Sequence, residues 1–252
     1  AGPIALDNLA MDQHFAGGQD ENWFVLIHVA IEAVAGRALG LGIDLVSASD
    51  AGDAALVERL LIEMNGVWDE INAIFDRMVE KCDPYIYFNR VRPYINGWKN
   101  NPAMPDGLIY EGVARFDGKP QPFRGQTGSQ SSIVPTMDAL FQVTHTQDEL
   151  RDFLAELHHY RPRKHRAFIE EMQAASRLRD FAKGQPQSLK DAFNACVEQV
   201  ARFRSRHLEY AAAYINKQAS HAAGNDPDVG TGGTPFMKYL KKHRDENRAQ
   251  TI

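Results

Sequence analysis

The chain is poor in cysteine, and that scarcity excludes several fold classes. Its 252 residues include two cysteines, Cys82 and Cys196. They lie far apart and form no CxxC pair, which disfavours a zinc ribbon, a thioredoxin-type motif and a disulfide scaffold. We therefore expect a reducing, cytoplasmic environment.

Excess positive charge and long apolar runs are also missing. Lysine and arginine total 28 against 33 acidic residues, a net charge of −5 that argues against nucleic acid or anionic lipid as a partner. No run approaches the ~18–20 apolar residues of a membrane span. The first residues, AGPIALDNLAMDQ, lack the basic and apolar regions of a signal peptide. We expect neither a membrane partner nor secretion.

What the sequence does contain is helical periodicity, with apolar residues at three- and four-residue steps. Asp20 is a candidate cap for the first helix, and Pro93 should bend or interrupt the third. With no alternating strands and no repeat, the class is all-α. The expected helices are 21–40, 52–80, 84–96, 133–144, 147–159, 163–183, 187–217 and 235–248.

Two segments lack periodicity. Residues 97–131 are rich in Gly, Pro, Asn and Gln, which indicates either an ordered loop of functional importance or a disordered one. Residues 222–234 (AAGNDPDVGTGGT) form a second flexible segment. The basic stretch KYLKKHR after it is expected to be a solvated helix face.

One histidine interrupts the apolar stripe of the helix at 187–217. His207 shares its face with Val200, Phe203, Ala211 and Tyr214. It is either a core histidine bonded to a backbone carbonyl or the axial ligand of a haem held without thioether links, since no CxxCH is present. In the second case Arg204, one turn earlier, is placed to reach a haem propionate. Spacing alone does not decide.

A second histidine lies in the nearly all-apolar helix at 21–40. His28 shares its face with Phe24, Val25, Ile31 and Glu32. It is either a core residue hydrogen-bonded to Glu32 or, together with His207, part of the wall of one cavity.

Several motifs together resemble one family. GWKNNP…DGLIYEG, GQTGSQSS, LHHYRPRKHRAFI, DAFNACVEQVARFRSRHLEYAAAYI and GTGGTPFMKYLKKHR resemble the indoleamine branch of the haem-dependent indoleamine/tryptophan 2,3-dioxygenases, in order and spacing. The resemblance covers almost the whole chain. It implies that residues 1–252 are a single large helical catalytic domain of the type that binds haem b, without the family's usual small N-terminal domain.

The resemblance also implies roles for individual residues. His207 matches the proximal iron ligand, and Arg204 matches an arginine that meets a propionate. Arg92 matches the arginine that holds the substrate carboxylate, for which a planar guanidinium suits better than lysine. Tyr87 and Phe88 match the aromatic pair that packs on the indole.

Two loops acquire roles in the same way. The loop 97–131 is implied to be an active-site loop, with Thr127, Gly128 and Ser129 beside the haem edge and the substrate ammonium. The segment 222–234 resembles a mobile lid, with Thr231 of its GTGG motif as a hydrogen-bonding residue.

The chain departs from the indoleamine pattern at several positions. His28 stands where a serine is usual and resembles the distal histidine of the tryptophan-specific branch, where that residue contacts the indole nitrogen. Tyr87 replaces a phenylalanine, Asn96 replaces a serine, and Pro93 follows Arg92. With the small domain absent, another segment or a partner chain is expected to complete the pocket.

The resemblance implies an oxidoreductase. The expected reaction is O₂-dependent cleavage of the indole C2–C3 bond of L-tryptophan or a related indoleamine, giving N-formylkynurenine, with His28, Arg92 and Thr231 nearest the chemistry. Three alternatives stand beside it: a haem-dependent monooxygenase or rearranging enzyme acting on a modified tryptophan, a haem-binding protein without turnover, and a helical scaffold with core histidines.

Overall fold

The computed structural model describes residues 2, 4–221 and 237–252 of the chain. Helices make up the regular structure of these residues and no strand is found among them, so the prediction of an all-α fold is confirmed. The longer helices are α1 (Gln19–Asp50), α2 (Ala54–Asp76), α5 (Ile133–Leu140), α6 (Glu149–His158), α7 (Arg163–Ala175), α9 (Gln187–Tyr214) and α10 (Met237–Arg248). Shorter pieces are α3 (Pro84–Ile86), α4 (Arg92–Ile95) and α8 (Leu178–Lys183).

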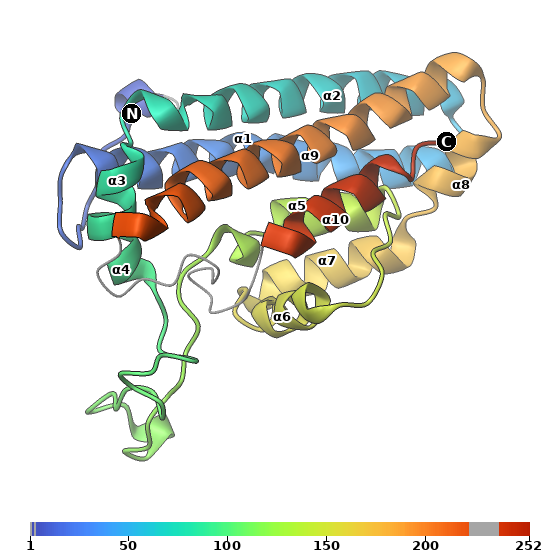
Figure 1. The fold of residues 1–252 in the computed structure, drawn as a ribbon. Helices are drawn as coiled ribbons and strands as arrows, with labels where there is room; N and C mark the ends of the chain where they lie inside the picture. The colour runs from blue at the N-terminus through green and yellow to red at the C-terminus, as the bar shows by residue number, and fades with distance from the viewer. Residues whose placement is uncertain (1, 3, 222–236) are drawn as a thin grey trace.

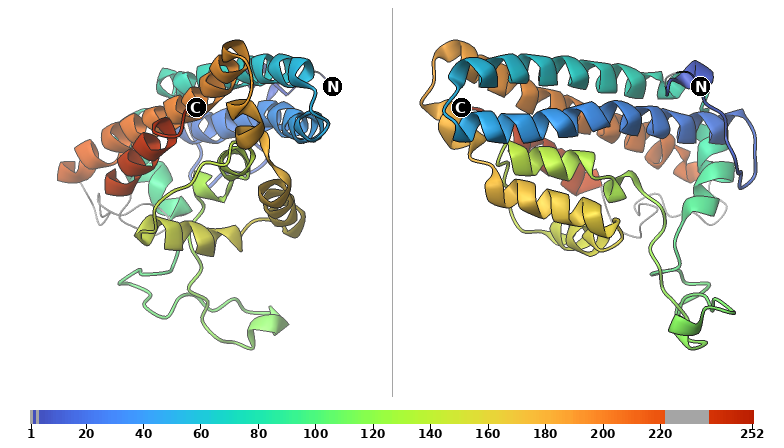
Figure 2. Two further views of the ribbon diagram at one scale, coloured as in Figure 1. Left: turned by 90° about the vertical axis from the view of Figure 1, so that its right-hand side faces the viewer. Right: turned by 180° about the vertical axis from the view of Figure 1, so that it is seen from behind.

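The core is built from α1, α2 and α9, which run side by side along the molecule (Figure 1). From behind, α1 lies between α2 on one side and α5 and α7 on the other (Figure 2). On α2, Leu61, Met64, Trp68 and Ile71 are fully buried at helical spacing. Each such side chain contributes about 1.5–3 kcal/mol on burial, so this stripe holds the three helices together.

Helix α1 extends ten residues beyond the predicted end at residue 40. Glycine at 42 lets the helix pass close to its neighbours, since a Cβ there would lie 3.4 Å from Met172 Cε and 3.5 Å from Leu140 Cδ2. The predicted cap, Asp20, is wrong: Gly18 is the N-cap, and the Asp20 carboxylate accepts from the Asp83 N–H at 2.6 Å instead.

The same helix is long and apolar enough to cross a membrane, with a mean hydropathy of 1.7 over an 18-residue window. The expectation that no run approaches the ~18–20 apolar residues of a membrane span is therefore wrong for this helix, by length and composition. A core helix passes the same test, and α1 packs against α2, α5 and α8 as a core helix does. Only 33% of the window is buried among the described residues, so these contacts account for part of its apolar character.

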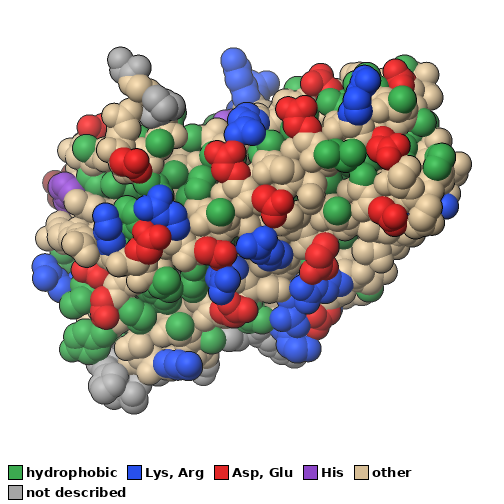
Figure 3. Space-filling view, turned by 90° about the horizontal axis from the view of Figure 1, so that it is seen from above, with side chains coloured by type: hydrophobic (Ala, Val, Ile, Leu, Met, Phe, Trp, Pro, Cys, Tyr) green, Lys and Arg blue, Asp and Glu red, His purple; other side chains and the backbone are tan. Residues whose placement is uncertain are grey.

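The outer face of the molecule carries charges of both signs. In the view from above, acidic and basic side chains are interspersed and no large patch of one sign appears (Figure 3). Across α2 and α9 they form ion pairs, such as Arg206 Nε to Asp76 Oδ1 at 2.6 Å. Pairs this exposed stabilise by less than about 1 kcal/mol each, so packing dominates the α2–α9 contact.

The segment predicted as one bent helix, 84–96, consists of three short pieces. Between α3 and α4 lies a π-helical turn, Tyr87–Val91, in which the Arg92 N–H donates to the Tyr87 carbonyl, five residues back. Pro93 follows at the start of α4, where its missing N–H costs little. The interruption expected at the proline is therefore a change of helix type one turn earlier.

Residues 98–123 of the loop project away from the helices (Figure 1). An isolated antiparallel bridge between Leu108 and Gln121 joins the outgoing and returning halves of the loop. Gly107 permits this crossing because its φ is +90° and a Cβ would lie 2.4 Å from the Gln121 backbone. The loop returns to the helices where the Gln126 N–H donates to the Ile95 carbonyl at 3.0 Å.

The helix predicted at 163–183 is divided into α7 and α8. The chain leaves the helix at Ser176, whose φ and ψ are −63° and 130°. The Ser176 hydroxyl is buried and donates to the Leu140 carbonyl at 2.6 Å. This bond ties the break to the end of α5.

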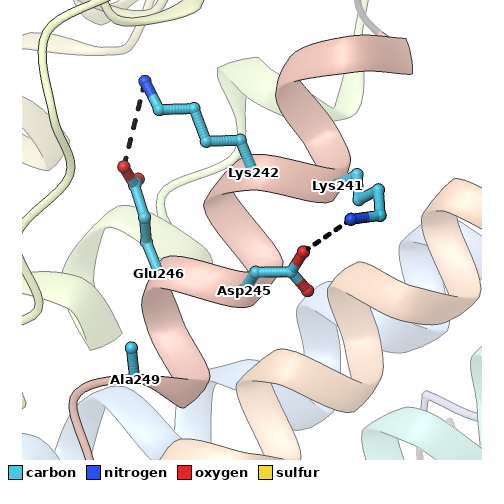
Figure 4. A pocket seen from close by; sticks show the side chains of 5 residues that line it. All are labelled: Lys241, Lys242, Asp245, Glu246 and Ala249. Atoms are coloured by element: carbon cyan, nitrogen blue, oxygen red, sulfur yellow. Dashed lines mark hydrogen bonds and ion pairs between the residues drawn. The ribbon is translucent and has the colours of Figure 1, made fainter.

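The prediction that the basic C-terminal stretch is a solvated helix face is only partly right. Helix α10 packs along α9 and buries His243 and Asn247, which are 4% and 1% exposed. Lys241 and Lys242 line a surface hollow, in which Lys241 pairs with Asp245 and Lys242 with Glu246 (Figure 4). One side of α10 is thus solvated and the other belongs to the interior.

Candidate functional site

Three elements surround the candidate site: the N-terminal half of α1, the C-terminal half of α9 and the π-helical turn. The ring of Tyr87, on the turn, lies 4.8 Å from Phe24 of α1 and 5.7 Å from Tyr214 of α9, between centroids. The Tyr214 hydroxyl donates to the Cys82 carbonyl at 2.7 Å and fixes α9 to the chain two residues before α3. These aromatic contacts form the floor of the candidate site.

His28 faces this region from α1. Its Nδ1 lies 2.7 Å from the Phe24 carbonyl, a distance that requires Nδ1 to carry the proton and donate. The partner of His28 is therefore a backbone carbonyl, and the predicted hydrogen bond to Glu32 is wrong. Burial lowers the pKa of His28, although the Phe24 carbonyl and Glu32 oppose the shift. The ring is thus neutral near pH 7, and Nε2 has a free lone pair.

His207 faces the same region from α9. Its side chain is exposed, yet desolvation, followed by the charge of His28, lowers its pKa to about 4. Within residues 2, 4–221 and 237–252, neither nitrogen of His207 makes a hydrogen bond, so the alternative of a core histidine held by a backbone carbonyl is not what the structure shows. This neutral imidazole is available as a metal ligand.

Arg204 lies one turn before His207 and is 9% exposed. One terminal nitrogen, Nη2, donates to Asp138 Oδ2 at 2.6 Å. The other, Nη1, is buried without a hydrogen-bond partner among the described residues. Because unpaired buried donors are rare, this nitrogen marks a place for an acceptor such as a propionate oxygen.

Asp138 holds this arginine from α5. Burial alone would raise its pKa, but Arg204 and His145 outweigh burial and lower it to about 2. The carboxylate is therefore charged at neutral pH and fixes the guanidinium in one orientation. No sequence pattern indicates this pair, because Asp138 lies 66 positions from its partner.

Arg92 and Phe88 lie together on the short helical segment. Arg92 is 2% exposed, and its guanidinium carbon lies 5.5 Å from the Phe88 ring centroid. Arg92 also acts electrostatically on Tyr87. Burial raises the pKa of Tyr87, and the positive charge of Arg92 opposes that increase. A buried cation is therefore adjacent to both aromatic side chains that were expected to contact the indole.

Thr127, Gly128 and Ser129 lie where the loop returns to the helices. The Thr127 hydroxyl accepts from the Ser129 N–H at 3.3 Å, and Arg161 Nη2 donates to the Ser129 carbonyl at 2.7 Å. None of the described hydrogen bonds or ring contacts joins these residues to His28 or His207. Their predicted place beside the haem edge stays a prediction, as does that of Thr231, which lies outside the described residues.

Sequence reasoning missed a second group of buried polar side chains, His145, His243 and Glu246. Their candidate ligand atoms all lie within 4.8 Å of one another. The pattern His243-x-x-Glu246 places both side chains on one helix face, which is a detectable signal. His145, about 100 positions away, has no such signal.

The chain matches the family model described as indoleamine 2,3-dioxygenase over residues 1–250. It is 32% identical to indoleamine 2,3-dioxygenase 1 of Rattus norvegicus, over 98% of this chain and 63% of the relative. It is 33% identical to indoleamine 2,3-dioxygenase 2 of Mus musculus, over 97% of this chain and 62% of that protein.

A fungal relative is more distant. Indoleamine 2,3-dioxygenase of Saccharomyces cerevisiae is 27% identical over 98% of this chain and 63% of its own length. The chain thus spans a little under two thirds of the length of the curated relatives it matches.

Proposed function

The chain belongs to the indoleamine 2,3-dioxygenase family, and from this premise we propose that it is a haem-dependent oxygenase that opens the indole C2–C3 bond of tryptophan or a related indoleamine with O₂. The product is N-formylkynurenine or its analogue. A bound haem would supply the activation of O₂, which no amino-acid side chain provides. The chain itself contributes binding, orientation and exclusion of water.

The residues on α9 fit haem b. The observation that carries the proposal is the pairing of an unbonded neutral imidazole, His207, with an unpaired buried donor, Arg204 Nη1, one helical turn away. Iron takes a neutral imidazole nitrogen, and a propionate takes a guanidinium N–H. Asp138 keeps Arg204 in position for this contact.

The short helical segment at residues 84–96 binds the substrate. Arg92 holds the amino-acid carboxylate by a charge-assisted contact, which is strong because the guanidinium is buried. Tyr87 and Phe88 pack on the indole, and their rings are fixed by Phe24, Tyr214 and Arg92. These contacts orient the indole ring relative to His207.

His28 positions the indole N–H. Since Nδ1 donates to the Phe24 carbonyl, Nε2 is the acceptor and takes a hydrogen bond from the indole nitrogen. The lowered pKa keeps Nε2 unprotonated at neutral pH. Such a contact favours substrates with a free N–H over N-methylated ones, because a methyl group leaves the acceptor unpaired.

The test is the absorption spectrum of the purified protein, together with the product formed from labelled O₂. The wild type should show a Soret band, and His207→Ala should lose it, whereas the control His159→Ala, an exposed histidine on the surface, should keep it. With ¹⁸O₂ the product should carry two labelled oxygen atoms. A His207→Ala variant with the wild-type spectrum would refute the haem assignment, and a product with one label would identify a monooxygenase.

A further inference from the structure

A buried cluster of histidine and carboxylate side chains connects α10 to the segment after α5. His145 belongs to that segment, and His243 and Glu246 lie one turn apart on α10. The side chains of His145 and His243 are 2% and 5% exposed. The two imidazoles stack at 4.4 Å between centroids with 13° between their planes.

The orientation of the rings leaves one nitrogen of each for a further ligand. Nε2 of His145 lies 3.4 Å from Asp138 Oδ2, and Nε2 of His243 lies 3.5 Å from Asp148 Oδ2. Both Nε2 atoms are buried, and neither has a hydrogen-bond partner among the described residues. Histidines that bind a metal often direct the other ring nitrogen to a carboxylate in this manner, which orients the ring. Nδ1 of each ring then remains as the coordinating atom.

Glu246 completes the set. Its Oε2 lies 2.9 Å from His145 Nδ1, and its Oε1 accepts from the Thr146 hydroxyl. In a tetrahedral site with ligand distances of about 2.0–2.1 Å, neighbouring ligand atoms are about 3.3 Å apart. The candidate atoms lie within 4.8 Å of one another, and binding of one ion requires the two stacked rings to rotate until their nitrogen lone pairs converge.

The local charge also favours a cation. The carboxylates of Asp138, Asp148 and Glu246 face this cluster, against the positive groups of Arg204 and Lys242. Lys242 is directed to Asp148 and lies farther from Glu246, at 3.8 Å, so it leaves Oε2 of Glu246 accessible.

We propose that His145, His243 and Glu246 form a structural site for a divalent transition metal, best suited to Zn²⁺, that fastens α10 to the segment following α5. Two imidazoles and one carboxylate are a ligand set that zinc accepts, with water in the fourth position. Asp138 links this site to Arg204, because its carboxylate lies next to His145 and also pairs with the Arg204 guanidinium.

The experiment measures zinc binding by the purified full chain after removal of metal with a chelator. Isothermal titration should give one Zn²⁺ per chain for the wild type. His243→Gln and Glu246→Gln should bind at least about tenfold more weakly, since each removes one ligand. Glu246→Gln preserves the size of the side chain, and circular dichroism checks that each variant is folded.

Two controls separate this site from other histidines. His158→Gln alters a surface histidine whose Nε2 also pairs with a glutamate, Glu170, at 3.0 Å, and should bind zinc like the wild type. His207→Ala should also retain zinc, whatever its effect on haem. Zinc K-edge absorption of the wild type should show two imidazole ligands. The proposal is overturned if the wild type binds no stoichiometric zinc, if folded His243→Gln binds as the wild type does, or if binding is lost in His207→Ala instead.

Discussion

The ion pair between Asp138 and Arg204 makes a quantitative prediction for Asp138→Asn. The carboxylate is 18% exposed and the guanidinium 10%, so solvent screens the pair only weakly. The pKa of Asp138 falls from 3.8 to about 2 on folding. At 1.36 kcal/mol per pKa unit, the ionised carboxylate contributes about 2 kcal/mol to the free energy of unfolding at pH 7. Asparagine also leaves Arg204 without its counter-charge, so we expect a loss of at least this size.

The pH dependence identifies the source of that loss. Because the folded pKa is depressed, the contribution is fully present above about pH 4 and is lost as the pH falls toward 2. The stability difference between wild type and Asp138→Asn should therefore shrink by about 1 kcal/mol between pH 7 and pH 3.

Urea unfolding of the haem-free protein at both pH values measures this difference. Asp180→Asn is the matched control, because Asp180 pairs with Lys183 on the surface and its loss should leave stability unchanged within error. Equal stability of wild type and Asp138→Asn at pH 7 would show that the pair does not stabilise the fold as the structure indicates.

Three further outcomes are expected. Arg92→Lys should raise the KM for tryptophan about tenfold or more with haem content unchanged, because a point charge replaces the planar guanidinium; an unchanged KM in steady-state kinetics contradicts the carboxylate assignment. Gly42→Val should lower the free energy of unfolding by about 1–3 kcal/mol, since its methyl groups meet Met172, whereas Gly36→Ala, where a Cβ has open space, should be neutral or stabilising in thermal unfolding. Haem retention should persist as the pH falls through 6.5 and decline near 4, following the pKa of His207; loss of the Soret band already near pH 6 argues against that neutral ligand.

Much of the helical framework was predictable because it depends on local periodicity. The stripe on α2 and the stop before Pro84 follow from residue spacing and backbone stereochemistry. The approach of His28 and His207 to a common region was also inferred from two isolated imidazoles on apolar helices. Each of these signals lies within one or two helical turns of sequence.

The errors share a different cause. Glycine has a low helix propensity, yet α1 continues through Gly42 because the helix packs against α5 and α7 at this point. Ser176 gives no breaking signal, since its bend depends on a bond to the distant Leu140 carbonyl. The burial of His243 on α10 and the Asp138–Arg204 pair likewise depend on tertiary contacts. Periodicity describes one element at a time and contains no information on which partner covers it.

The π-helical turn at Tyr87–Val91 determines the rotational phase of everything that follows it. A π turn amounts to one residue added to an α-helix, and one residue corresponds to about 100° of rotation about the axis. Deleting Asn89 and restoring an α-helical turn would swing Arg92 about a quarter of a circle away from Phe88. A change of length by a single codon is thus enough to redirect the buried guanidinium.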